Sequence, residues 1–267
     1  MSALLATTLS ERPWGVDSLP APFASPPGKR VGEVWFTPPA ALDALLVKYI
    51  FTSEKLSVQV HPTDAEAPKG SRGKEECWLI LGAEPGASIA IGFTAPIGPA
   101  AMRAAALDGS IEQLLAWYPV EPGDFFYIPA GTVHAIGPGL SLIEVQQNSD
   151  ITYRLYDYGR GRELHLDAGI AVAQGTPHDP ADRRHVPLRG DVALVEGPHF
   201  RLDRLDGPPL PEVAARYHGA LLVLPLDNPL EVAGEVVGPG QCALAASLDQ
   251  VAFAGRSLIA QPCQPKL

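Results

Sequence analysis

The stretch GDFFYIPAGTVH, residues 123–134, decides how the rest of the sequence is interpreted. It predicts a β-turn, a strand, a Pro-Ala-Gly turn and then a histidine, His134, that enters the next strand. Histidine binds first-row metal ions through a neutral ring nitrogen. Upstream candidate partners for it are Gln59, His61 and Glu76. Together these four side chains predict a metal pocket inside a β-barrel.

The first half of that pocket comes from the segment LSVQVH, residues 56–61, in which apolar and polar residues alternate. This is the period of a half-buried strand, and side chains two apart share a face. Ser57, Gln59 and His61 are therefore expected on one face, and Glu76 opens the next predicted strand. Two imidazoles, one carboxylate and one amide oxygen suit Zn²⁺ or a similar divalent ion, with one position left for water or substrate.

Bulk properties exclude several classes of protein. The chain has 267 residues, a net charge of −10 and no block of lysine or arginine, so a nucleic-acid partner is not expected. Three cysteines at no useful spacing argue against a disulfide framework or a cysteine zinc site. The start lacks the pattern of a signal peptide, and the longest apolar run is too short to span a bilayer. A cytoplasmic protein without a membrane partner is the expectation.

The 28 prolines and 26 glycines predict frequent turns and short strands, and so a mainly β fold. Residues 1–30 are expected to form an irregular arm, residues 40–47 a short helix and residues 96–117 a longer helical insertion. A polar connector with a short helix is expected at residues 161–188. Strands are expected at residues 30–37, 56–61, 77–81, 88–92, 124–128, 134–136, 142–147, 152–156, 192–196, 200–205, 220–224, 230–232, 241–246 and 250–254.

Four segments carry a resemblance to a known family: LSVQVHP (56–62), GKEECW (73–78), IPAGTVHAI (128–136) and EVQQNSDITYRLYD (144–157). They are similar to the short bacterial form of the type I phosphomannose isomerases, which belong to the cupin superfamily. The resemblance runs from about residue 12 to about residue 172. It departs from the cupin motifs at Gln59, which replaces a histidine, and at Pro138, which replaces an asparagine. The histidine that precedes the lysine in larger members is also absent here, so no role is carried over for it.

The resemblance implies a cupin (jelly-roll) barrel over residues 1–175 and a smaller, degenerate cupin-like barrel without a site over residues 176–267. It implies one Zn²⁺ per chain, and the ligands fall on Gln59, His61, Glu76 and His134. The implied reaction interconverts mannose 6-phosphate and fructose 6-phosphate through an enediol(ate). The expected partner is thus a small phosphorylated sugar, and the expected state is a monomer or a weak homodimer.

Three residues are expected to be catalytic: Arg154, Lys74 and Asp150. The arginine suits electrostatic stabilisation of an enediolate, because it is not readily deprotonated. The base stays open between Lys74, Asp150 and a water on the metal. Substrate is expected to bind Ser57, Lys74 and Arg154, with the serine placed at the phosphate by the resemblance.

Two alternatives remain at this point. One is a cupin isomerase of another sugar phosphate that uses the same metal site. The other is a non-catalytic sugar-binding cupin, which has no need of an acid–base set beside a metal.

Overall fold

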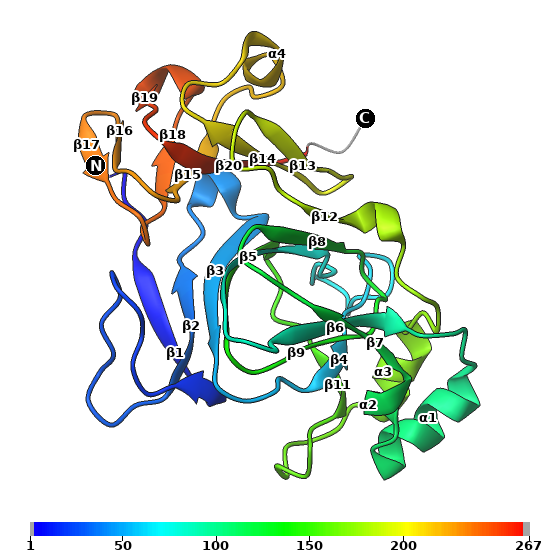
Figure 1. Cartoon of the computed structure of the whole chain (residues 1–267). Helices are drawn as coiled ribbons and strands as arrows, with labels where there is room; N and C mark the ends of the chain where they lie inside the picture. Colours follow the sequence, from blue (N-terminus) through cyan, green and yellow to red (C-terminus); the bar gives the residue numbers. More distant parts are fainter. Residues whose placement is uncertain (1–2, 264–267) are drawn as a thin grey trace.

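The computed structural model describes residues 3–263, and β-strands dominate it (Figure 1). Two antiparallel sheets face each other in the first part of the chain. The larger sheet runs in the order β1 (Thr7–Val16), β2 (Val31–Phe36), β3 (Leu45–Thr52), β10 (Leu140–Gln147), β5 (Glu76–Ala83), β8 (Asp124–Ile128) and β12 (Arg183–His185). The smaller runs in the order β11 (Tyr153–Tyr156), β4 (Val58–Val60), β9 (His134–Ile136), β6 (Ser88–Phe93) and β7 (Leu115–Pro119).

The space between these sheets is filled by large apolar side chains. Trp78 and Ile80 of β5 meet Ile89 and Ile91 of β6 in one buried cluster. The chain alternates across the pleat, so every second residue of these strands enters this core. The two sheets are not joined into a closed ring of paired strands.

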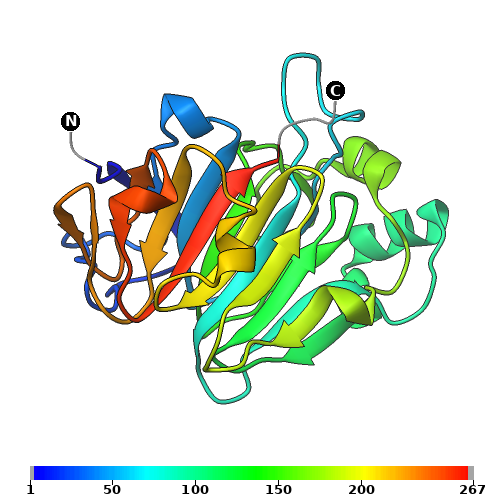
Figure 2. The same ribbon diagram turned by 90° about the horizontal axis from the view of Figure 1, so that it is seen from above.

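Two further sheets come from the C-terminal part of the chain. One has the order β13 (Val192–Glu196), β14 (Phe200–Asp206), β20 (Arg256–Pro262), β15 (Leu221–Pro225) and β18 (Ala243–Ala245), and the other β17 (Glu235–Val237), β16 (Leu230–Val232) and β19 (Val251–Ala252). The five-stranded sheet lies against the outer face of the larger N-terminal sheet (Figure 2). Phe200 and Leu258 share one apolar cluster there with Val34 and Tyr49.

Short helices connect the strands. They are α1 (Pro99–Asp108), α2 (Ile111–Leu114), α3 (Leu166–Val172), α4 (Pro211–Ala214) and the 3₁₀ turns η1 (Ala40–Leu42), η2 (Pro180–Asp182) and η3 (Leu248–Gln250). The helix α3 confirms the short helix predicted in the connector. None of the helices in residues 3–263 has the length and apolar character needed to cross a membrane.

Three predictions in the N-terminal part are wrong. The arm predicted over residues 1–30 is not irregular throughout, because residues 7–16 form β1, which pairs with β2. The helix predicted at residues 40–47 is only the turn η1 followed by β3, in which all eight residues are buried. Because a strand covered on both faces has no polar alternation, its sequence has no period of two to detect.

The predicted helix 96–117 is also wrong as a single element. It breaks at Gly109, which ends α1 with a positive φ of 83° and lies against Tyr156, where a Cβ would come within 2.8 Å of the phenol oxygen. Residues 115–117 belong to β7 instead. In the C-terminal part, β17 and β20 were not predicted. The division into units at residue 175 stays a prediction, and β12 beyond it pairs with β8.

Phe200 tests how strongly the two parts of the chain depend on one another. This side chain is completely buried where the C-terminal sheet meets the N-terminal one. Truncating a buried phenylalanine leaves a cavity that the surroundings fill only in part. We expect Phe200→Ala to lower the free energy of unfolding in urea by about 3–5 kcal/mol. Leu188→Ala, at a side chain that is 69% exposed, is the control and should change it by no more than about 0.5 kcal/mol.

Candidate metal centre and its pocket

Three potential metal ligands converge where β4, β5 and β9 meet. His61 follows β4, Glu76 is the first residue of β5, and His134 is the first residue of β9. One ligand atom from each lies within 4.8 Å of the others, and all three residues are buried. The Nε2 atom of His61 is 3.5 Å from Glu76 Oε2, and that of His134 is 3.4 Å from Glu76 Oε1.

Hydrogen bonds at the far side of both rings fix which nitrogen faces the centre. The Nδ1 of His61 is 2.8 Å from the carbonyl oxygen of Ile151, and that of His134 is 2.9 Å from the carbonyl oxygen of Thr132. A carbonyl oxygen only accepts, so each Nδ1 carries the proton and each Nε2 presents a lone pair to the centre. This is the usual support of metal-bound histidines.

Burial keeps both imidazoles uncharged at neutral pH. It holds the pKa of His61 well below the ordinary value, with the charge of Lys74 acting in the same direction. It also lowers the pKa of His134 to about 4. Two lone pairs therefore face a fully buried carboxylate, which is costly without compensating positive charge nearby. The donor set fits Zn²⁺.

Gln59 supplies the fourth predicted ligand. It pairs with His134 in the β4–β9 ladder, and its amide Nε2 is 3.2 Å from His134 Nε2. The Oε1 at the other end accepts a hydrogen bond of 3.2 Å from Ser57 Oγ. A half-turn of the amide exchanges these ends, puts the oxygen at the centre and lets the serine hydroxyl accept instead. The side chain thus fits a metal-ligand role.

The ammonium of Lys74 is the nearest basic group to this centre. Its Nζ lies 2.8 Å from Glu76 Oε2 and 3.0 Å from His61 Nε2. Burial acts to lower the pKa of Lys74, but the charges of Glu76 and Glu144 outweigh it and the pKa is raised. Burial also raises the pKa of Glu76 to about 7, against the opposing effect of Lys74.

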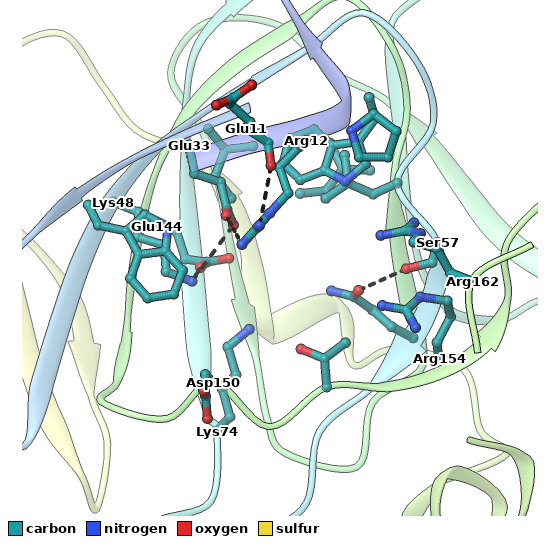
Figure 3. A pocket seen from close by; sticks show the side chains of 18 residues that line it. Glu11, Arg12, Glu33, Lys48, Ser57, Lys74, Glu144, Asp150, Arg154 and Arg162 are labelled. Atoms are coloured by element: carbon teal, nitrogen blue, oxygen red, sulfur yellow. Dashed lines mark hydrogen bonds and ion pairs between the residues drawn. The ribbon is translucent and has the colours of Figure 1, made fainter. Parts of the chain in front are cut away.

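The centre opens into a cavity of about 420 Å³ whose polar side chains are drawn in Figure 3. One wall is a buried chain of charges. Arg12 contacts Glu33 at 2.6 Å, and Lys48 Nζ lies 4.0 Å from Glu33 and 3.0 Å from Glu144. The indole Nε1 of Trp78 donates to the other oxygen of Glu144 at 3.0 Å. Every member therefore has a partner of opposite charge, and the wall is held rigidly.

The opposite wall carries two guanidinium groups, Arg154 and Arg162, together with Ser57 (Figure 3). Arg162 makes two hydrogen bonds of 2.7 and 2.5 Å to Asp157. Arg154 donates to the carbonyl oxygen of Glu163 at 2.7 Å, while its buried Nε has no hydrogen-bond partner among residues 3–263. Burial, and then the charge of Arg162, lowers the pKa of Arg154. Two guanidinium groups side by side, only one of them paired with a carboxylate of the described chain, make this wall chemically suited to an anion.

The structure brings the predicted site residues either to this cavity or to the buried cluster next to it. His61, Glu76 and His134 form the metal cluster, and Ser57, Gln59, Lys74, Asp150 and Arg154 line the cavity. Asp150 is exposed, in the loop between β10 and β11. The individual catalytic and substrate-binding roles stay predictions.

Sequence reasoning missed one wall of the pocket and part of the other: Arg12, Glu33, Lys48, Glu144 and Arg162. A signal was present for two of them. Lys48 and Glu144 each interrupt a run of apolar residues, and a charged side chain in a buried strand requires a partner of opposite charge.

Comparison with known proteins supports this picture. No family model matches the chain. It is 41% identical over 167 residues to "Mannose-6-phosphate isomerase" of Streptococcus mutans, a match to 58% of this chain and 52% of that protein. It is 45% identical over 139 residues to "Mannose-6-phosphate isomerase ManA" of Bacillus subtilis, a match to 49% of this chain and 44% of that protein. The chain thus spans about half the length of the curated relatives it matches.

The whole chain superposes on a solved structure. The mannose 6-phosphate isomerase of Bacillus subtilis matches with a TM-score of 0.75 at 22% identity and covers 97% of this chain and 98% of that one. The fold is that of the phosphomannose isomerases. The predicted cupin fold is thereby confirmed. A zinc-bound mannose 6-phosphate isomerase also matches, with a TM-score of 0.69 at 14% identity over 98% of this chain and 99% of that one.

The buried charge wall makes stability depend on pH. Burial acts to raise the pKa of Glu144, but Lys48, Lys74 and the indole of Trp78 outweigh it and lower the pKa from 4.5 to about 2. A depressed carboxylate pKa stabilises the fold above pH 4.5, and this contribution is lost as the pH falls from 4.5 towards 2. The shift corresponds to about 3 kcal/mol.

We therefore expect Glu144→Gln to be less stable than wild type at pH 7 and to lose less stability between pH 5 and pH 2. Urea unfolding at several pH values measures this difference. Glu212→Gln, at an exposed carboxylate, is the control and should follow the wild-type profile. Parallel profiles for wild type and Glu144→Gln would contradict the assignment.

Proposed function

We propose that this protein is a zinc-dependent isomerase that interconverts mannose 6-phosphate and fructose 6-phosphate. The observation that carries the proposal is the convergence of two neutral imidazoles and a buried carboxylate beside Lys74, in a cavity whose far wall carries two arginines. Four curated relatives named mannose-6-phosphate isomerase, 37–45% identical over parts of their length, support the same activity. The cytoplasmic location and the monomeric or weakly dimeric state stay predictions.

His61, Glu76, His134 and the amide oxygen of Gln59 would hold one Zn²⁺ per chain. When bound, the ion supplies a Lewis acid that polarises the sugar oxygens next to the reacting carbons. The carbonyls of Ile151 and Thr132 keep both histidines in the tautomer that this role needs.

The chain's own groups would then handle the proton and the charge. The reaction moves a proton between C1 and C2, so it needs a base on one face and stabilisation of the enediolate oxygens. Arg154 would stabilise that negative charge, because a guanidinium keeps its proton at neutral pH. Lys74 and Asp150 line the same cavity and are the proposed proton carriers.

The phosphate would lie against the arginine wall. Ser57, Arg154 and Arg162 line that side of the cavity, and guanidinium and hydroxyl groups are suited to phosphate oxygens. Asp157 orients Arg162 through two hydrogen bonds and thereby reduces the entropy lost on binding.

Metal content and activity together test the proposal. We expect purified protein to contain about one zinc per chain, and chelation to abolish turnover of mannose 6-phosphate in a coupled assay until zinc is restored. His134→Ala should lose the metal, whereas Arg154→Ala should keep it and lose activity. Full activity after exhaustive chelation would contradict the proposal.

The same assay separates the alternatives. Faster turnover of glucose 6-phosphate would indicate an isomerase of another sugar phosphate. Binding of sugar and metal without exchange of the C2 proton with solvent would indicate a non-catalytic cupin.

Arg162 gives a sharper test of where the phosphate binds. Loss of one charge-assisted contact to phosphate costs about 1.5–3 kcal/mol. We expect Arg162→Ala to raise KM for mannose 6-phosphate about tenfold or more, and to weaken inhibition by inorganic phosphate to the same degree. Arg189→Ala, at an exposed arginine that does not line the cavity, is the control and should change neither. An unchanged KM in Arg162→Ala would place the phosphate elsewhere.

A further inference from the structure

The short segment that leads into β5 is held from outside the pocket. It carries Lys74 and ends at Glu76, so its position sets the distance between the ammonium and the metal cluster. Its amides are bound one after another: Gly73 N donates to Asp64 Oδ1 (2.7 Å), Lys74 N to the carbonyl of Pro62 (2.9 Å) and Glu75 N to Gln147 Oε1 (3.0 Å). The backbone here is therefore fixed by two side chains and one backbone carbonyl from other segments.

Two of these acceptors contact one histidine from the C-terminal part of the chain. Gln147 Nε2 donates to Asp64 Oδ1 at 3.0 Å and lies 3.2 Å from His199 Nδ1. The same Nδ1 is 3.4 Å from Asp64 Oδ2. On its other side, His199 Nε2 lies 3.9 Å from Glu75 Oε2. His199 thus touches both side chains that fix the segment, and the segment itself.

The tip of the β13–β14 hairpin, residues 197–199, carries His199 into this place. Gly197 approaches so closely that a Cβ on it would lie 3.1 Å from Tyr127 Oη and 3.2 Å from Glu75 Oε1. The carbonyl of His199 accepts a hydrogen bond of 2.8 Å from Cys263 N, which ties the hairpin to the end of β20. The position of the hairpin tip is therefore fixed by the C-terminal sheet to which it belongs.

The segment is extended, so its side chains alternate between two environments. Lys74 and Glu76 lie at the metal centre, while the buried Glu75 between them points to the hairpin. A displacement of Glu75 would carry both neighbours with it. We propose that His199 is a positioning residue for Lys74 and Glu76, through which the C-terminal part of the chain supports the metal centre.

This inference deepens the proposed function, but its main readouts do not depend on the sugar that is isomerised. The test compares His199→Ala with His199→Gln, whose amide retains a donor and an acceptor. His218→Ala is the matched control, because that histidine is exposed in the same part of the chain and lies away from residues 73–76. All variants are measured well below their melting temperatures.

The first readout is hydrogen–deuterium exchange of the amides of residues 73–75, followed by mass spectrometry. We expect faster exchange there in His199→Ala, with unchanged exchange in β6 on the other sheet. The second is zinc affinity by competition with a chelator, which we expect to fall about tenfold, the usual effect of losing support behind a metal ligand. His199→Gln should recover most of both losses.

Two outcomes would overturn the inference about His199. A lower melting temperature in His199→Ala with unchanged local exchange and zinc affinity means a merely structural role and overturns the inference. Faster exchange without a change in zinc affinity overturns it too, because the segment would then move without consequence at the metal. If the wild type lacks isomerase activity, the proposed function fails, while exchange and zinc affinity still test His199.

Discussion

The fully buried carboxylate of Glu76 is the constraint on which the rest of the site depends. An isolated charge at this depth is very costly, and the lone pairs of two neutral imidazoles face it as well. Positive charge must therefore lie close to the carboxylate. Lys74 supplies it on one side, and a set of potential metal-ligand atoms lies on the other. The end of β4 and the starts of β5 and β9 meet at this point, so the pairing of strands in the two sheets brings the candidate ligands together.

The two walls of the cavity differ in their charge balance. The wall around Lys48 and Glu144 is internally neutralised, and its ion pairs and indole hydrogen bond leave it with a fixed shape. The arginine wall keeps an excess of positive charge, which a phosphate can neutralise. A chain with a net charge of −10 can therefore attract an anion, because what matters at short range is the local field in the cleft.

The sequence predicted that these candidate ligand side chains lie together, because they stand at positions with strong local signals. Gln59 and His61 lie on a strand with one polar face, and His134 follows a Pro-Ala-Gly turn. It failed at β3, where residues 40–47 were predicted as a helix. The run from Leu45 to Phe51 is polar only at Lys48, and the salt bridge that explains this lysine comes from β10, almost a hundred residues away. Such pairings depend on sheet order, which no local pattern encodes.

The covering of the larger N-terminal sheet on both faces suggests a role for the C-terminal part of the chain, which the sequence predicts to carry no site of its own. At the start of β5, side chains point alternately to the pocket and to the C-terminal hairpin. The side chains that face the pocket are held in place only if the opposite face packs against the hairpin. A metal centre needs its ligands held to within fractions of an ångström, and a strand end exposed to solvent on its outer face would not hold them so tightly. The C-terminal sheet removes that freedom by burying Glu75 behind the ligand. On the inference drawn from His199, the C-terminal part contributes to the metal centre through packing and hydrogen bonds.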